Sequence, residues 1–222
     1  MDQTTMTTAP IPSNGAGSRR TQVERREEAE RRMLDAAVTL IAEKGFSAFV
    51  LADVAEAAGY SRGLPTHYFR TKEALISRAA DWIVERFRSR VEERLTESGG
   101  LGSVLAFADH YLEHAEEDPA EARALSRILA EATTSNALGD FIRQLNERTV
   151  QRLAEALRVG QAAGDVSRDI DPGIQGTLIL GLMRGVVGQW LLDPSPAYMQ
   201  NVRREVRVQL TRALHPAGSL AK

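Results

Sequence analysis

Apolar residues recur every three or four positions along most of this chain, which is the spacing that places them on one face of an α-helix. Stretches in which polar and apolar residues alternate, as they do in half-buried β-strands, are not prominent. The sequence therefore predicts an all-α protein built from several amphipathic helices.

The first strongly periodic segment ends at Gly45 and is followed by two short helices. Its apolar stripe consists of Leu34, Ala37, Val38, Ile41 and Ala42. A short helix is predicted over residues 51–58, where Gly59 stops it. Another is predicted over residues 64–69, with Pro65 in its first turn, where the missing N–H costs little. Two short helices joined by a tight turn are typical of a helix-turn-helix, although an ordinary helical hairpin has the same spacing.

A fourth, much longer helix is predicted to begin behind Thr71, whose hydroxyl can cap it. Its apolar stripe continues to about Leu95 and contains Ile76, Ala79, Ile83, Phe87 and Val91. At ~1.5 Å per residue, such a helix is more than about 30 Å long. We expect it to link the helix-turn-helix mechanically to the rest of the chain.

The remaining chain also has helical spacing. Helices are predicted over residues 103–116, from Asp118-Pro119, over about 137–161, from Asp171-Pro172, and from Met199 to Leu214. The helix after Pro172 is apolar for nearly the length of a membrane span. Arg184 and Gln189 interrupt it, which favours a buried helix and no membrane partner.

The turn and the second short helix carry polar groups suited to DNA. No acidic residue lies between Glu56 and Glu73. Basic and hydroxyl side chains gather there instead, namely Arg62, His67, Arg70 and Lys72 with Ser61, Thr66, Tyr68 and Thr71. Because such groups pair with phosphate oxygens and base edges, this face is a candidate DNA-binding surface.

One segment of the chain resembles the DNA-binding domain of the TetR family of bacterial transcription regulators. It starts at Arg31 and reads RRMLDAAVTLIAEKGFSAFVLADVAEAAGYSRGLPTHYFRTKEALI. The resemblance rests on the order and spacing of AEKGF, DVAEAAG, SRG and HYFRTKEAL. The chain departs from the family at Val50, where Thr or Ser is usual, and at residues 64–66, where Thr-Leu-Tyr is usual. Asp53 occupies the position of a capping-box acid, but Val50 has no hydroxyl to complete the box.

The resemblance implies an N-terminal three-helix helix-turn-helix domain over residues 19–78. A larger helical domain for ligand binding and dimerisation is expected over residues 79–215, with tails at 1–18 and 216–222. The expected partner is a double-stranded DNA operator. The residues expected to contact it are Ser61, Arg62, Gly63, Leu64, Thr66, His67, Tyr68 and Lys72, with Tyr68 and Lys72 at phosphate positions.

The last two helices are candidates for a homodimer interface. In TetR relatives these helices form a four-helix bundle across a two-fold axis, and the match in position implies the same here. A dimer reads an inverted repeat whose half-sites lie roughly 34 Å apart. Small residues on one helix and an apolar stripe on the other form the expected interface, which consists of Gly181, Gly185, Gly188, Met199, Val202, Val206 and Leu210.

The second domain is expected to contain a chamber for a small apolar or amphipathic effector. Its candidate residues, which can equally be plain core, are Phe107, Tyr111, Phe141, Met183 and Trp190. The expected function is that of a cytoplasmic, nucleoid-associated repressor that leaves its operator when the effector binds. The alternatives are a TetR-like regulator displaced by a partner protein and a DNA-organising protein without an effector.

Composition and charge narrow these interpretations. A chain of 222 residues has room for one small and one larger domain. Its net charge of −2 excludes nonspecific coating of nucleic acid, so DNA binding requires a local basic patch. The absence of cysteine fits a reducing cytoplasm. Residues 1–18 lack the basic and apolar blocks of a signal peptide.

Other kinds of chemistry find little support. His110 and His114 are four residues apart and could share a metal, but no third ligand is identifiable, which favours a surface or pocket pair. No nucleophile motif, glycine-rich phosphate loop or paired-carboxylate motif stands out, so no enzyme activity and no cofactor are expected. The charged run over residues 19–32 is typical of a solvated helical face, although Arg19 and Arg20 could instead reach into a minor groove.

Overall fold

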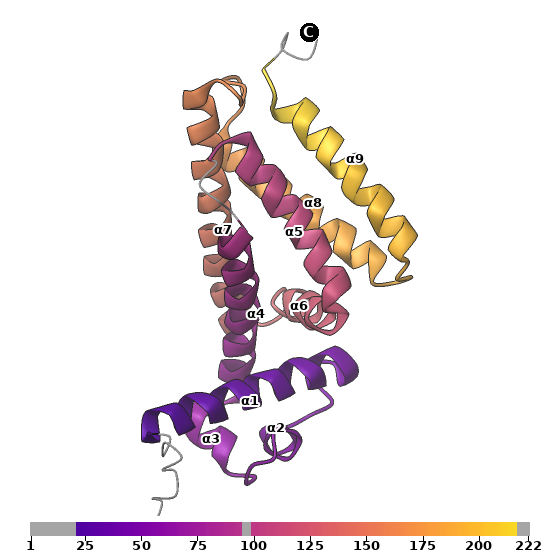
Figure 1. The fold of residues 1–222 in the computed structure, drawn as a ribbon. Coiled ribbons are helices and arrows are strands. Elements are labelled where there is room, and N and C mark those ends of the chain that lie inside the picture. The colour runs from indigo at the N-terminus through magenta and orange to yellow at the C-terminus, as the bar shows by residue number, and fades with distance from the viewer. Residues whose placement is uncertain (1–20, 95–98, 217–222) are drawn as a thin grey trace, which may run out of the picture.

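The computed structural model describes residues 21–94 and 99–216, which form nine α-helices and no strand. The small α1–α3 unit lies at one end of the molecule, α4 rises from it, α6 lies beside α1, and α5, α7, α8 and α9 extend toward the other end (Figure 1). The helices are α1 Gln22–Lys44, α2 Leu51–Ala57, α3 Leu64–Phe69, α4 Lys72–Arg94, α5 Leu101–Glu117, α6 Pro119–Glu131, α7 Asn136–Ala163, α8 Pro172–Trp190 and α9 Pro196–Leu214. The predicted all-α fold is confirmed.

The helix-turn-helix forms as predicted. The chain turns after α2 at Gly59, whose φ of 77° is readily adopted only by a residue without a Cβ. The N–H of Tyr60 donates to the carbonyl of Ala55 at 2.8 Å and so caps the end of α2. α3 then begins at Leu64, with Pro65 buried in its first turn. These local signals fix the position of α3 relative to α2.

α4 is the long connection that the apolar stripe predicts. Its start is capped by Thr71, whose hydroxyl accepts a hydrogen bond from the N–H of Ala74 at 3.1 Å. With 23 residues the helix is roughly 35 Å long. The predicted end near Leu95 lies outside the described residues. α4 therefore runs from the end of α3 into the second domain (Figure 1).

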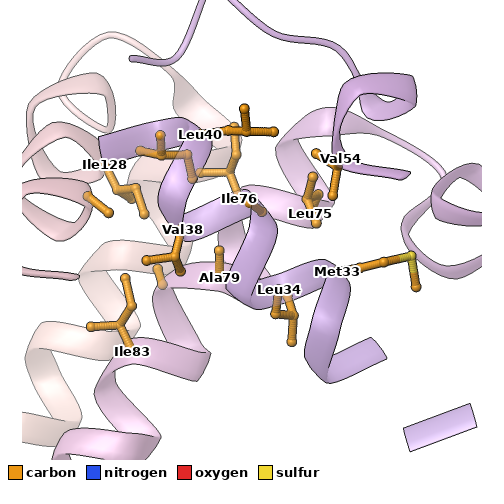
Figure 2. Close-up of a cluster of buried hydrophobic side chains, with 14 of the residues drawn as sticks. Met33, Leu34, Val38, Leu40, Val54, Leu75, Ile76, Ala79, Ile83 and Ile128 are labelled. Carbon is orange, nitrogen blue, oxygen red and sulfur yellow. The ribbon is translucent and has the colours of Figure 1, made fainter. Parts of the chain in front are cut away.

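The apolar core of the small unit continues into the second domain. Figure 2 shows side chains from α1, α2, α4 and α6 meeting in one cluster, with Ile128 of α6 close to α1. Val38, Ile83 and Ile128 are all buried in this cluster. A second cluster joins α5, α7, α8 and α9. The core thus does not divide at residue 78, because α6 and α7 also pack against α1 and α4.

The apolar helix α8 is covered by other helices of the chain on one side only. Ile179, Met183 and Val187 are buried, while several other apolar residues of α8 are exposed. Across the described ranges, none of the helices is both long and apolar enough to cross a bilayer.

Candidate functional site

The turn before α3 and the helix α3 itself carry most of the residues expected to contact DNA. Pro65 and Phe69 turn inward and are buried, which leaves Thr66 and His67 exposed on the opposite side. The predicted residues Ser61, Arg62, Gly63, Thr66 and His67 are exposed, whereas Leu64 and Tyr68 are half-buried. The helix is therefore anchored by its apolar residues and presents a short polar edge to solvent.

The N-terminal turns of α1 lie beside α3 and enlarge this surface. The Tyr68 hydroxyl donates to the carbonyl of Arg26 at 3.4 Å, and the Arg26 guanidinium lies 5.7 Å from the centre of the Tyr68 ring. A shallow depression of about 430 Å³ is lined by Gln22, Val23, Arg25, Arg26, His67 and Tyr68. From its sequence, this part of α1 was predicted to be only a solvated face. Two adjacent arginines in the first turns of a helix are a pattern that also suits phosphate contacts.

Lys72 is held more tightly by the protein than the sequence indicates. Its ammonium donates to the carbonyl of Phe49 at 2.5 Å. It also lies 4.4 Å from the ring centre of Phe49 and 5.1 Å from that of Phe46. An ammonium has three N–H groups, so two remain for a phosphate after the carbonyl is bound. Lys72 therefore joins α4 to the loop before α2.

The start of α2 has half of a capping box, as predicted. The backbone N–H of Val50 donates to the Asp53 carboxylate at 2.8 Å. The Val50 side chain offers no acceptor to the helix and is 58% exposed. The N–H of Asp53, which an N-cap hydroxyl at residue 50 could bind, donates to the backbone carbonyl of Val50 at 3.0 Å instead.

The second domain contains a cavity of about 630 Å³ between α4, α5, α6, α7 and α8. Its wall is mainly apolar and includes many small residues. The lining residues are Ile83, Val84, Phe87, Tyr111, His114, Ala115, Ala122, Leu125, Ser126, Leu129, Ala130, Ala132, Thr133, Gly139, Ile142, Arg143, Asn146, Arg184, Gly185, Val187 and Gly188. This volume lies in the range of pockets for small organic ligands.

Four of the five residues predicted to contact the effector do not line this cavity. Tyr111 does, but Phe107 packs behind it, 5.8 Å from its ring centre. Met183 and Trp190 are buried in the second core cluster, and Phe141 borders a separate surface depression. The prediction favoured large side chains, whereas the wall of this cavity includes many small ones, so the two sets share only Tyr111.

Arg184 is the central polar group of the cavity. Its guanidinium donates to the side-chain carbonyl of Asn146 at 2.6 Å. It also faces Tyr111, whose pKa is raised by burial and only partly lowered again by the Arg184 charge. The Nε atom of Arg184 is buried and has no hydrogen-bond partner. Within the described part of the chain, no carboxylate pairs with this arginine.

Charged groups connect the cavity wall to the small unit. His114, which lines the cavity, lies 2.8 Å from Glu121, whose side chain is only 1% exposed. Glu121 lies 3.0 Å from Arg86 of α4, and Arg86 lies 3.3 Å from Asp35 of α1. In addition, the indole N–H of Trp82 donates to Asp35 at 3.0 Å. These contacts join α5, α6, α4 and α1 in one continuous network.

His110 and His114 of α5 lie close together. The rings of His110 and His114 lie 6.2 Å apart, and His114 has the Glu121 carboxylate beside it. Over residues 21–94 and 99–216, no group of three or more potential ligands is placed to hold a metal ion.

On α6, Arg127 donates to the carbonyl of Ile41 at 2.8 Å. This bond gives α6 a polar attachment to α1 besides their shared core.

The α9 residues expected at the dimer interface are used inside the chain. Met199, Val206 and Leu210 are buried in the second core cluster, and Val202 packs against it. The amphipathic stripe of α9 is covered mainly by α5 of the same chain (Figure 1). A stripe on a surface helix must be buried, and α5 is close enough to bury this one. A role of these residues at a dimer interface stays a prediction.

α8 presents an exposed apolar face. Ile174, Leu178 and Leu182 are 62%, 58% and 40% exposed, respectively. A Cβ added at Gly181, Gly185 or Gly188 would meet no atom within 4 Å. Gly185 and Gly188 also line the cavity, so they are left out of the exposed patch defined next. We call Ile174, Leu178, Gly181 and Leu182 the α8 patch.

Comparison with known proteins identifies both parts of the chain. Residues 33–79 match the model of bacterial regulatory proteins of the tetR family, and residues 102–215 match the C-terminal model of BetI-type transcriptional repressors. The HTH-type transcriptional regulator CymR of Pseudomonas putida is 42% identical over 77 residues, which are 35% of this chain and 38% of that protein.

Solved structures share the fold over most of the chain. FadR from Bacillus subtilis, in complex with stearoyl-CoA, has a TM-score of 0.75 at 20% identity and covers 83% of this chain and 99% of its own. A transcriptional regulator from Saccharomonospora viridis, in complex with choline, has a TM-score of 0.73 at 22% identity and covers 85% of this chain and 98% of its own. The two ligands differ in charge and size, so the fold alone does not define the ligand.

Proposed function

Because the chain belongs to the TetR family of bacterial transcriptional regulators, we propose that it is a homodimeric repressor released from its operator by a small molecule. Members of this family bind DNA and are not enzymes. The effector binds in the cavity of the second domain, and the protein acts on DNA in the cytoplasm. The observation that carries this proposal is that two helices belong both to the cavity wall and to the core of the small unit.

α4 is the first of these helices. Ile83 lines the cavity and is also buried in the core that contains α1 and α2. A ligand that displaces this part of α4 therefore also displaces the helix whose start follows α3. Because packed helices move as rigid elements, a small shift at the cavity changes the position of the recognition helix.

α6 is the second of these helices, and nothing in the sequence pattern pointed to it. Leu125 and Leu129 line the cavity, while Ala124 and Ile128 on another side of α6 are buried in the core with α1. The Arg127 contact to the Ile41 carbonyl strengthens this attachment. An occupied cavity thus acts on α1 as well as on α3. Only a difference in ligand affinity between the two positions can drive this change.

The homodimer is supported by the α8 patch. Three large apolar side chains are exposed there beside a glycine whose Cβ position is open. Contiguous exposed apolar residues on one helix are typical of a protein interface. A two-fold axis beside α8 would pair two copies of the same patch and give two recognition helices for an inverted repeat.

The proposal is tested by a ligand screen followed by DNA binding. Small apolar and amphipathic compounds of all charges are screened by thermal shift, and an operator is selected from random DNA with the purified protein. At least one stabilising compound is expected to weaken operator binding, by roughly 5- to 150-fold. Compounds that bind the protein but leave operator affinity unchanged would contradict the proposal. Release by a protein in cell extract, with no active compound, would favour control by a partner protein.

A further inference from the structure

The charges that line the cavity are all of one sign. Within the described wall there are two arginines and one histidine but no aspartate or glutamate. Arg143 is exposed and lies 2.7 Å from Asp140. His114 has Glu121 beside it at 2.8 Å. Arg143 and His114 therefore have carboxylate neighbours outside the wall, and Arg184 is the remaining basic side chain of the described wall.

Arg184 has only neutral partners. It donates to Asn146 at 2.6 Å and faces the Tyr111 hydroxyl, and its buried Nε makes no hydrogen bond. A guanidinium offers five N–H donors in a planar fork, so donors remain for a ligand. A positive charge beside an apolar wall and without a counter-ion attracts an anion more strongly than it would in water. The same charge repels a cation such as a quaternary ammonium.

On this basis we propose that the effector is a small amphipathic carboxylate whose acid group pairs with Arg184 and whose apolar body lies against Phe87 and the small residues of α6. This inference rests on the proposed function, because it names the ligand class of the same cavity. A carboxylate matches the fork of the guanidinium with two parallel hydrogen bonds. Its single negative charge balances the single unpaired arginine, whereas a dianionic phosphate ester would leave one charge over.

The choline bound to one of the compared structures sharpens this choice. The Saccharomonospora regulator is in complex with choline, which is a cation, although it shares the fold of this chain. In this chain a cationic head group would meet Arg184 without a compensating carboxylate in the wall. The inference therefore separates this protein from neighbours that share its fold but bind cations.

The test uses matched ligands that differ only in the head group. Octanoate, decanoate, 3-phenylpropanoate and 4-phenylbutanoate are compared with their primary amides and with trimethylammonium compounds of the same apolar bodies. Binding to the full-length protein is measured by calorimetry and thermal shift at pH 7, where the acids are ionised. The variants are Arg184→Met, Arg184→Lys and, as a matched control, Arg148→Met, which removes an exposed arginine of α7 outside the cavity.

The wild-type protein is expected to bind at least one carboxylate about tenfold or more tightly than its amide. In Arg184→Met the ratio of carboxylate to amide affinity should fall to near one, while the amide still binds. Arg184→Lys should keep part of the preference for the carboxylate, and Arg148→Met should keep all of it. Amides or ammonium compounds that bind as tightly as the acids, or a preference that survives in Arg184→Met, would overturn the inference and leave a ligand-responsive regulator intact. If no compound of any charge bound, the ligand-responsive function would fail as well.

Discussion

The two candidate functional regions differ in where their polar groups lie. On α3 they are exposed to solvent, and in the second domain they face an enclosed cavity. On α3, buried Pro65 and Phe69 anchor a short helix whose polar side chains face solvent. In the second domain, Arg184 faces into a cavity whose wall is mostly apolar. The first arrangement suits an extended charged partner such as DNA, and the second suits a small ligand that is largely surrounded. One all-α chain thus contains an exposed polar edge and an enclosed apolar cavity, and α4 and α6 connect the two.

The buried side of α3 is expected to matter most for stability. Phe69 is 4% exposed and belongs to the core that contains α1 and α4. Phe69→Ala should lower the free energy of unfolding by about 3 to 5 kcal/mol, because it leaves a large void. The exposed neighbour serves as the control, since His67→Ala should leave stability almost unchanged. Chemical denaturation followed by circular dichroism measures both, and similar losses in the two variants would show that the orientation assigned to α3 is wrong.

The α8 patch is expected to have the next largest effect. Leu178→Asp places a charge in the proposed interface without disturbing the core of the chain, because Leu178 is 58% exposed. The unpaired charge should weaken dimerisation at least about a hundredfold and operator binding with it. Sedimentation at micromolar concentration measures the oligomeric state. Val159→Asp, at an exposed apolar residue of α7 outside both the α8 patch and the DNA surface, is the control and should remain dimeric. A Leu178→Asp variant that stayed dimeric would place the interface elsewhere.

On the DNA surface, Thr66 and Lys72 are expected to act differently. Thr66→Ala should cost roughly 1 to 3 kcal/mol only on operators in which it removes a base contact. Lys72→Ala should weaken binding to all sequences and lower the salt slope by roughly one unit per half-site. Because Lys72 also binds the Phe49 carbonyl, its removal should lower the stability of the domain as well. The affinities of both variants for a panel of operator sequences, measured at several salt concentrations, test this difference. Identical dependence on sequence and salt in the two variants would contradict the separate roles of Thr66 and Lys72.

The smallest expected effect concerns the incomplete cap of α2. Val50→Thr supplies a hydroxyl at a residue whose φ of −122° and ψ of 169° suit an N-cap. It should raise the free energy of unfolding by about 1 kcal/mol, with Val50→Ala as the control that lacks the hydroxyl. Thermal unfolding measures the gain, and equal stability of the two variants would mean that the cap is not formed.

Sequence patterns predicted the helix-turn-helix much better than the cavity. The start and end of α3 follow from Pro65, from Gly59 and from the turn before Thr71, which are all local signals. The cavity has no such signal. Residues such as Ala115 and Ala122 resemble ordinary core positions, and only the packing of five helices places space beside them. The α9 stripe was recognised, but the sequence could not show that α5 covers it.

The central claim is that occupation of the cavity controls operator affinity. It is tested most directly by measuring operator affinity with and without saturating ligand for the wild type and for Ala122→Phe, which fills space on the α6 side of the cavity. We predict that the ligand weakens operator binding roughly 5- to 150-fold in the wild type. Ala122→Phe should bind the operator as the wild type does and should not respond to ligand. Equal responses of the two proteins, or a wild type that binds ligand and operator independently, would contradict the account.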